Sequence, residues 1–264
     1  MLKKICVSII IPAYNEERTI IEVLEKVREQ TLQGVTFEVI VVDDGSKDQT
    51  VNILKANPNL YSRLLVSEKN GGKGAAVRKG LEAATGDYIL FQDADLEYDP
   101  SDYASLVFPV QNYKADVVIG SRLLASKYSR VFYFWHQIGN KFITTAFNIL
   151  NNTTFSDTYS CYLLFKRSLL EPRELISNSW DQQAEILSIV VNRGRIFYET
   201  PISYHGRTYD EGKKIRSYHV VPVLWMMVKK WFLLKFFSSP LAHQNVDQPD
   251  VSVFLSKPST VDEK

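Results

Sequence analysis

The first 95 residues alternate between short apolar runs and longer segments with a helical pattern of apolar positions. The apolar runs have the length and the β-branched or aromatic composition of buried strands. The segments between them carry apolar residues at helical spacing or consist of good helix formers. Strands that alternate with helices predict a mostly parallel sheet with right-handed crossovers, and hence an α/β fold. The predicted strands are residues 5–11, 37–42, 63–66 and 88–91, and the predicted helices are residues 19–27, 51–54 and 75–84.

The rest of the chain shows the same two patterns and then becomes polar. A cation-rich segment over residues 205–214 is predicted to be a mobile loop. An apolar segment that contains lysines follows over residues 220–237, and the polar, proline-containing composition after Pro240 predicts a disordered tail. The remaining predicted helices are residues 100–113, 131–150 and 182–191, and the remaining predicted strands are residues 116–119, 159–165 and 195–204.

Polar or flexible residues follow three of the predicted strands at the point where each strand ends. These stretches are Pro12–Glu16, Asp43–Ser46 and Asp93–Glu97. Ligands of open α/β sheets bind at the carboxyl ends of the strands. The sequence therefore predicts a nucleotide-type crevice at this edge of the sheet.

Three carboxylates stand at alternate positions after the fourth strand: Asp93, Asp95 and Glu97. If the backbone stays extended there, all three side chains point to one side. Carboxylates about 4 Å apart repel by roughly 1 kcal/mol in water and by several times more in a protein. A bound cation relieves this repulsion, and hard oxygen ligands suit Mg²⁺ or Mn²⁺. The alternative is a solvated acidic turn.

Composition and charge narrow the class of protein. A net charge of +1 gives no argument for nucleic-acid binding. Cys6 and Cys161 lie in apolar runs and are predicted to be buried thiols in a reducing compartment. The histidines lack zinc-ligand spacing, and neither a signal peptide nor a run of about 20 uncharged apolar residues is present. We therefore expect a cytoplasmic catalytic or binding domain.

The stretch Gly71-Gly72-Lys73-Gly74 differs from a P-loop, because a P-loop has Ser or Thr after its lysine. We therefore reject an ATPase and expect a flexible lead-in to a helix, with Lys73 close to a phosphate.

Six short motifs follow one another along the chain: Pro12-Ala13-Tyr14-Asn15-Glu16, Asp43-Asp44-Gly45-Ser46, Gly72-Lys73-Gly74, Asp93-Ala94-Asp95, Gly120-Ser121-Arg122, and Arg207 with Lys213. In this order they resemble the family 2 glycosyltransferases and, among them, the polyprenyl-phosphate (dolichyl-phosphate) mannose and glucose synthases. The resemblance extends from about residue 7 to residue 215. It implies a GT-A fold, meaning a Rossmann-like, mostly parallel sheet flanked by helices in one domain. It also implies a nucleotide-sugar donor and a divalent cation.

The same resemblance divides the chain. A glycosyltransferase domain over 1–215 would contain a nucleotide-binding half (about 1–97) and an acceptor half (about 98–215). An amphipathic helical segment over 216–238 and a disordered tail over 239–264 would follow.

The resemblance also implies roles for individual residues. Asp44 would accept a hydrogen bond from the base, although a tight turn with a helix cap also explains its motif. Asp93 would hold the ribose or a neighbouring water. Asp95 would bind the metal with Glu97, and the metal would neutralise the charge that develops on the leaving diphosphate. The other residues implied to contact the donor are Pro12, Tyr14, Glu16, Val42, Lys73 and Ala94, and those implied to contact the donor diphosphate and the acceptor phosphate are Arg122, Arg207 and Lys213.

The acceptor side departs from the family pattern. At Asp157-Thr158-Tyr159-Ser160-Cys161 a carboxylate that some relatives carry is missing. The implied mechanism is inversion by direct displacement. An ionised lipid phosphate needs no general base, whereas a hydroxyl acceptor would need one, with Asp157 or Glu185 as the candidates.

The apolar segment over residues 220–237 combines tryptophans and phenylalanines with lysines, a composition that suits a lipid headgroup region. Trp135 and its neighbours could add a second contact, and the alternative is ordinary packing on the domain. We therefore predict a cytoplasmic enzyme, peripheral on the inner face of the membrane, that transfers a hexose from GDP-mannose or UDP-glucose to a polyprenyl phosphate. The alternatives are transfer to a glycan or protein hydroxyl, and a non-catalytic module that binds nucleotide sugars.

Overall fold

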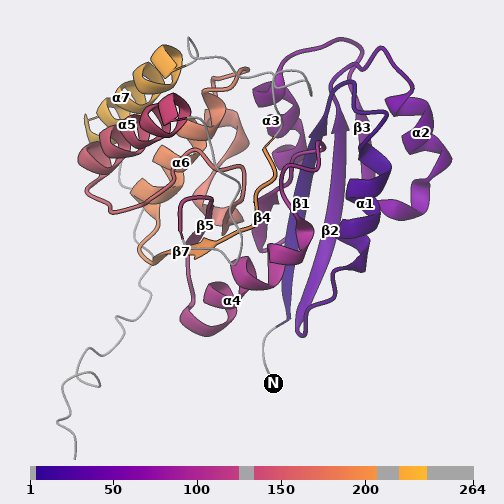
Figure 1. Cartoon of the computed structure of the whole chain (residues 1–264), viewed down its shortest axis with the longest axis horizontal. Coiled ribbons are helices and arrows are strands. Elements are labelled where there is room, and N and C mark those ends of the chain that lie inside the picture. Colours follow the sequence, from indigo (N-terminus) through magenta and orange to yellow (C-terminus); the bar gives the residue numbers. More distant parts are fainter. Residues whose placement is uncertain (1–3, 125–133, 207–219, 237–264) are drawn as a thin grey trace, which may run out of the picture.

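A seven-stranded sheet forms the centre of the molecule in the computed structural model, which describes residues 4–124, 134–206 and 220–236 (Figure 1). The long strands in the first half come from continuous β-branched runs, which suit a sheet covered on both faces. In sheet order the strands are β3 (Arg63–Val66), β2 (Val35–Asp43), β1 (Ile5–Ala13), β4 (Tyr88–Phe91), β6 (Leu163–Lys166), β5 (Val117–Ser121) and β7 (Phe197–Pro201).

Strand β6 runs antiparallel to both of its neighbours, β4 and β5, and all other pairs are parallel. The prediction of a mostly parallel sheet is therefore confirmed. Because β6 is reversed, its amino end lies beside the carboxyl end of β4. The hydroxyl of Tyr162, just before β6, donates a 2.8 Å hydrogen bond to Gln92, just after β4. The predicted strand over 159–165 thus begins later, and its first residues belong to this edge of the sheet.

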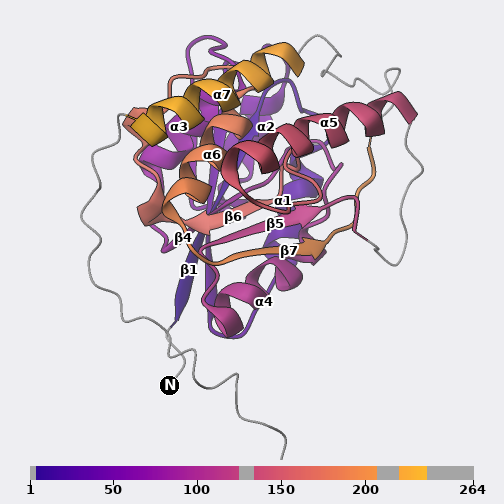
Figure 2. The ribbon, with the colours of Figure 1, turned by 90° about the vertical axis from the view of Figure 1, so that its left-hand side faces the viewer.

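Helices cover both faces of the sheet. The chain crosses from β1 to β2 to β3 in one direction and returns to β4, so α3 lies on the face opposite α1. Figures 1 and 2 show α7 outermost, with α5 and α6 between it and the sheet, and α4 on the other side. The helices are α1 (Ile20–Glu29), α2 (Thr50–Ala56), α3 (Lys73–Ala83), α4 (Tyr103–Tyr113), α5 (Phe134–Asn151), α6 (Gln182–Arg193) and α7 (Val220–Phe236), and the short 3₁₀ turns are Pro58–Leu60, Pro100–Asp102, Arg167–Leu169 and Pro172–Glu174.

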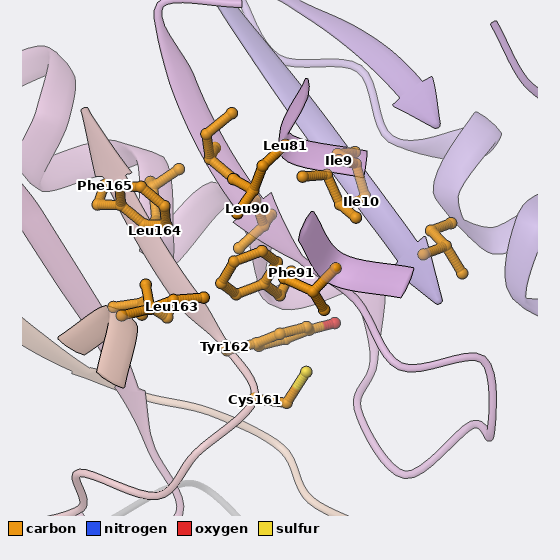
Figure 3. Packing of buried hydrophobic residues seen from close by; sticks show 14 of the residues in the cluster. Ile9, Ile10, Leu81, Leu90, Phe91, Cys161, Tyr162, Leu163, Leu164 and Phe165 are labelled. Atoms are coloured by element: carbon orange, nitrogen blue, oxygen red, sulfur yellow. The ribbon is translucent and has the colours of Figure 1, made fainter. Parts of the chain in front are cut away.

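The hydrophobic core extends over both faces of the sheet, and Figure 3 shows the part where β1, β4 and β6 lie near Leu81 of α3. Ile10, Leu90 and Leu164 are fully buried, and burial of each such side chain contributes roughly 1.5–3 kcal/mol. A glycine at position 80 lets α3 approach closely, because a Cβ there would lie 2.4 Å from the Cγ2 atom of Ile10. This packing holds the ends of the strands in fixed positions.

Some predictions concern residues at the edge of this core or outside the described part. Cys161 is buried as predicted, whereas Cys6 is only half-buried because it lies near the start of β1. Helix α7 packs against α6 and α5. Within the described residues, no helix is both long enough and apolar enough to cross a membrane. The predicted tail (239–264), most of the loop 205–214 and the side chain of Trp135 lie outside the described residues.

Candidate active site

A pocket of about 380 Å³ lies where β1, β2 and β3 end. Ala13 of β1 and Val66 of β3 both pair with Asp43 of β2, so the loops after the three strands start at one edge. Of the residues assigned to the donor from the sequence, Tyr14 lines this pocket. Pro12, Glu16, Val42 and Asp44 do not line it, and Val42 is fully buried in the core. The lining also includes Asp43, Ser46, Val66, Ser67 and Asn70.

The adjacent residues Asp43 and Asp44 have different surroundings. Oδ2 of Asp43 accepts hydrogen bonds of 3.0 Å from the backbone N–H groups of residues 45–46. Oδ1 of Asp43 is buried and has no hydrogen-bond partner among the residues that the structure describes. Asp44 instead uses both oxygens, at 3.0 and 2.8 Å, to accept from the N–H groups of residues 71–72. The unpartnered acceptor in the wall of the pocket therefore belongs to Asp43, which has no exposed surface and was not assigned to the site from the sequence.

The loop after β1 is fixed to the loop after β2. Asn15 has φ of 55°, and its N–H donates to Oγ of Ser46 at 2.9 Å. Its Oδ1 accepts from the N–H of Lys47 at 2.8 Å, and the N–H of Glu16 donates to Oγ1 of Thr50 at 2.9 Å. Glu16 thus contributes to the shape of the pocket rim through its backbone.

The glycines before α3 form a packed contact, which corrects the prediction of a flexible lead-in. The N–H of Gly74 donates to the carbonyl of Asn178 at 3.0 Å. Gly72 has φ of +93°, and a Cβ there would lie 2.2 Å from the same carbonyl oxygen. A side chain at either position would therefore separate α3 from the segment around Asn178.

Lys73 and Asp93 form an ion pair of 2.5 Å beside Trp180, whose ring centroid lies 5.4 Å from Nζ of Lys73. Burial works against the charge on Lys73, but the attraction of Asp93 outweighs it and raises the pKa of the amine. The contacts of Lys73 with phosphate and of Asp93 with ribose remain predictions. In this structure the two side chains neutralise each other.

The acidic stretch after β4 turns instead of staying extended, so the condition on which the common direction of its three carboxylates depended is not met. Leu96 has φ of 62°, which reverses the chain between Asp95 and Glu97. Ala94 is buried, and its carbonyl accepts from Oγ1 of Thr19 at 2.7 Å, which ties the turn to the residue before α1. Among the described residues, no group of three or more His, Cys, Asp or Glu is close enough to hold a metal on its own.

Tyr204 connects this turn to Arg122, which follows β5. Its hydroxyl donates to Oε2 of Glu97 at 2.7 Å, and its ring centroid lies 5.1 Å from the guanidinium carbon of Arg122. Burial raises the pKa of Tyr204, and the charges of Glu97 and Asp95 raise it further. Asp95 also contributes to the raised pKa of Lys73, so its charge acts on both Lys73 and Tyr204.

Arg122 is bound by Asp157, which is fully buried. Nε and Nη2 of the guanidinium donate to the two carboxylate oxygens at 2.7 and 2.8 Å. Burial alone would raise the pKa of Asp157, but Arg122 outweighs that effect and lowers it. The N–H of Asp157 donates to Glu199 of β7 at 3.2 Å. Asp157 is therefore part of a structural network, which argues against its predicted role as a general base.

Glu185 is also unsuited to the role predicted for it, because its side chain is fully buried under α7. It forms an ion pair of 2.7 Å with Lys230 and accepts from the N–H groups of Ile176 and Ser177 at 3.0 and 2.9 Å. Arg207 and Lys213 lie outside the described residues, and their roles stay predictions.

Residues 8–173 match the family model described as Glycosyl transferase family 2, which spans more than half of the chain. The chain belongs to glycosyl transferase family 2. The resemblance inferred from the six motifs is confirmed at the level of the family.

Two relatives of this family 2 chain carry named activities. A dolichyl-phosphate beta-glucosyltransferase of Trichomonas vaginalis is 37% identical over 140 residues, which cover 48% of this chain and 43% of the relative. A dolichol-phosphate mannosyltransferase of Pyrococcus furiosus is 35% identical over 117 residues, covering 44% and 33%. The chain thus spans less than half of either relative.

Solved structures place the chain in the GT-A fold. Glucosyl-3-phosphoglycerate synthase of Mycobacterium tuberculosis, in complex with phosphoglyceric acid, has a TM-score of 0.64 at 21% identity, covering 86% of this chain and 80% of that one. The same enzyme with Mn²⁺, UDP and glucosyl-3-phosphoglycerate has a TM-score of 0.63 at 20% identity, with the same coverage. At 20–21% sequence identity, this similarity establishes a shared fold only.

The acidic turn suits a divalent cation that is coordinated partly by the protein and partly by a substrate. Asp95 and Glu97 offer hard oxygens two residues apart at the end of β4. Mg²⁺ is usually held by one or two carboxylates together with substrate phosphates and waters, so a preformed cage of three carboxylates is not required. Three residues near the site were not assigned to it from the sequence. Asp43 could have been found, because it belongs to the motif Asp43-Asp44-Gly45-Ser46. Tyr204 and Trp180 could not, because their contact partners are distant in the chain.

Proposed function

We propose that this family 2 chain is an inverting glycosyltransferase that moves a hexose from a nucleoside diphosphate sugar to a polyprenyl phosphate. The observation that carries the proposal is the junction of two features at one sheet edge, the pocket at the ends of β1–β3 and the acidic turn after β4. The two relatives that use dolichyl phosphate support the choice of acceptor.

The nucleoside would occupy the pocket beside Asp43. A buried acceptor without a partner is costly, and a hydrogen-bond donor on the base would remove that cost once a small movement of the pocket wall exposes Oδ1 of Asp43. Tyr14 lines the same pocket and offers an aromatic face for stacking. Asp44 would act indirectly, by holding the glycine turn that borders the site.

The diphosphate would lie over the acidic turn. Asp95 and Glu97 would hold a Mg²⁺ or Mn²⁺ ion, which supplies positive charge to the leaving diphosphate. Solved structures of the M. tuberculosis enzyme contain Mn²⁺ or Mg²⁺ with UDP, which supports this choice of cation. Tyr204 would orient Glu97 through their 2.7 Å hydrogen bond.

Both candidate bases on the acceptor side are held in buried ion pairs, Asp157 with Arg122 and Glu185 with Lys230. A carboxylate with a lowered pKa is a weak base, as in the case of Asp157. This favours an acceptor that is already ionised, such as a phosphate, over a hydroxyl. Arg207 and Lys213 are proposed to bind that phosphate.

In the proposed step a phosphate oxygen of the acceptor attacks the anomeric carbon from the side opposite the leaving group. The new carbon–oxygen bond forms as the bond to the donor diphosphate breaks, and the electron pair of that bond leaves with the nucleoside diphosphate. No proton has to be moved. The anomeric configuration is inverted.

The acceptor would be reached at a membrane surface. Helices α5 and α7 expose large apolar side chains, among them Phe142, Trp225, Phe232 and Phe236, next to the exposed cations Lys229 and Lys235. Aromatic residues interleaved with lysines suit the headgroup region of a bilayer. We therefore propose peripheral contact through these two helices, on the cytoplasmic face.

Transfer assays test the proposal. Radiolabelled GDP-mannose and UDP-glucose are incubated with the full chain, polyprenyl phosphate in detergent micelles, and Mn²⁺ or EDTA. We expect label in the organic extract with one donor, and its loss with EDTA or in Asp95→Ala. The control Glu25→Ala removes an exposed carboxylate on α1 and should retain full activity. Label that stays in the aqueous phase would point to a soluble acceptor, and absence of transfer with every donor would refute the proposal.

A further inference from the structure

Helix α7 places a lysine on its inner face. Lys230 is 7% exposed, whereas Trp225 on the same helix is 67% exposed. The partner of Lys230 is Glu185 of α6, which has no exposed surface. A buried charge is tolerated only when it is paired and hydrogen-bonded, so the seating of α7 on α6 depends on this contact.

The carboxylate of Glu185 also fixes a segment of backbone. Oε1 accepts from the N–H of Ile176 at 3.0 Å, and Oε2 accepts from the N–H of Ser177 at 2.9 Å. Lys230 adds a 3.0 Å hydrogen bond to the carbonyl of Glu174, just before these two residues. One lysine and one glutamate therefore bind the backbone of residues 174–177, which Arg193 also holds through Glu174.

This segment continues into the contact with the glycine turn before α3. The carbonyl of Asn178 accepts from the N–H of Gly74, and Arg78 of α3 donates to the carbonyl of Leu175 and to Oδ1 of Asn178 at 3.1 and 3.0 Å. The N–H groups of residues 71–72 in turn bind Asp44, next to the pocket. An unbroken series of contacts thus joins α7 to the end of β2.

We infer that Lys230 and Glu185 are positioning residues that couple the seating of α7 to the affinity of the donor pocket. The inference rests on the proposed function, because it requires a nucleotide in that pocket. Loss of the ion pair would remove the contacts of Lys230 with Glu185 and with the carbonyl of Glu174, shift residues 174–178 and the glycine turn, and weaken nucleotide binding. Coupling between sites is reciprocal, so a bound nucleotide would also hold α7 more firmly on α6.

A second lysine supplies a matched control. Asp116, just before β5, accepts from two backbone N–H groups, those of residues 195 and 196, and pairs with Lys166 at 2.5 Å. This is the same combination of groups as at Glu185. It lies at the opposite edge of the sheet from the pocket, because β4 and β5 are both antiparallel to β6 and Asp116 stands at the amino end of β5. Lys166→Met therefore removes an ion pair of the same groups without reaching the donor, although the side chain of Lys166 is 38% exposed and that of Lys230 is 8% exposed.

The experiment measures binding of UDP and of GDP, each with Mn²⁺, by calorimetry on the full chain at a temperature where every variant is folded. We expect Lys230→Met to raise the Kd of the bound nucleotide about tenfold, within the usual range of coupling between sites. Lys230→Arg should restore most of the affinity. Lys166→Met should leave Kd within about twofold of the wild type, even where it lowers Tm, since an ion pair far from the pocket has no coupling to it.

Unchanged Kd in folded Lys230→Met would overturn the inference. So would equal losses in Lys230→Met and Lys166→Met, since that result indicates general destabilisation. A wild type that binds neither nucleotide would instead refute the proposed function, and the inference with it. If Lys230→Met does not fold, amide hydrogen exchange of the wild type, measured with and without nucleotide, tests the coupling instead. Nucleotide should slow exchange at Ile176, Ser177 and residues 226–230, and protection confined to the strand ends would overturn the coupling.

Discussion

The two halves of the candidate site are held together by different interactions. On the proposed donor side, Asp43 binds backbone N–H groups of its own loop, and Asp44 and Asn15 bind those of neighbouring loops. On the proposed acceptor side, charged side chains are buried against each other, as in the pairs of Arg122 with Asp157 and of Lys230 with Glu185. Backbone contacts define the shape of a pocket, whereas buried ion pairs determine how elements distant in the sequence are placed. Substitutions of the first kind of contact should therefore change mainly the shape of the pocket, and substitutions in the buried ion pairs should change mainly the stability and placement of the packed elements.

The largest effect is expected at Arg122. Arg122→Met would leave the carboxylate of Asp157 buried without its partner, and loss of one member of a buried pair destabilises by about 3–5 kcal/mol. Urea unfolding measures the change. The double variant Arg122→Met/Asp157→Leu should recover a good part of the lost stability, and a single-variant loss below about 1 kcal/mol would show that the pair is not desolvated.

On the donor side, Gly72→Ala should cost about 2–3 kcal/mol, because it combines a left-handed φ with a steric clash at the carbonyl of Asn178. Thermal unfolding and nucleotide binding should both be impaired. The matched control is Gly139→Ala in α5, where a Cβ meets nothing within 4 Å. There the same change should stabilise by roughly 0.5–1 kcal/mol. Equal effects at the two positions would contradict this account of the glycine turn.

Substitutions of the two neighbouring aspartates should separate an effect on the shape of the pocket from an effect on nucleotide recognition. Asp44→Asn replaces one of two acceptor oxygens with a donor that faces an N–H group, which should cost about 1–3 kcal/mol of stability. Asp43→Asn can keep its oxygen on the turn and place its amide at the open position, so stability should change little. Nucleotide affinity should then fall about tenfold, as expected for one lost hydrogen bond to a base. Normal binding by Asp43→Asn would refute its role as the base acceptor.

The smallest effect concerns pH. Burial raises the pKa of Asp102 to about 6, from an ordinary value near 3.8. Because the folded form holds the proton more tightly, stability should fall as pH rises from about 4 to 6 and stay lower above that range. Asp102→Asn should remove this slope and stabilise the protein at pH 7 by about 1 kcal/mol, since partial exposure reduces the effect. Urea unfolding at pH 4.5 and pH 7 measures it, and identical slopes in both proteins would contradict the assignment.

The sequence predicted the elements and the family well because both depend on local patterns. The β-branched runs and helical spacing placed β1–β4 and α1–α3 nearly as observed. The path of the acidic turn could not be predicted, because the reversal at Leu96 depends on contacts with Thr19 and Tyr204.

The partners of Arg122 and Glu185 were missed for a related reason. Each lies 35 or more residues away along the chain, and no periodicity links such positions. Asp43 and Asp44 share one motif, so only the three-dimensional arrangement could separate a residue with an open acceptor from one that holds a turn.

The reversed strand β6 has an evolutionary consequence. Because β6 enters the sheet from the site edge, the residues that lead into it, from about 152 to 162, belong to the acceptor half and include Asp157, the partner of Arg122. Insertions or deletions in this segment would remodel the proposed acceptor side without altering the loops after β1 and β2. Under the proposed function, such an arrangement would allow descendants of one ancestor to change what they glycosylate while keeping the same activated sugar.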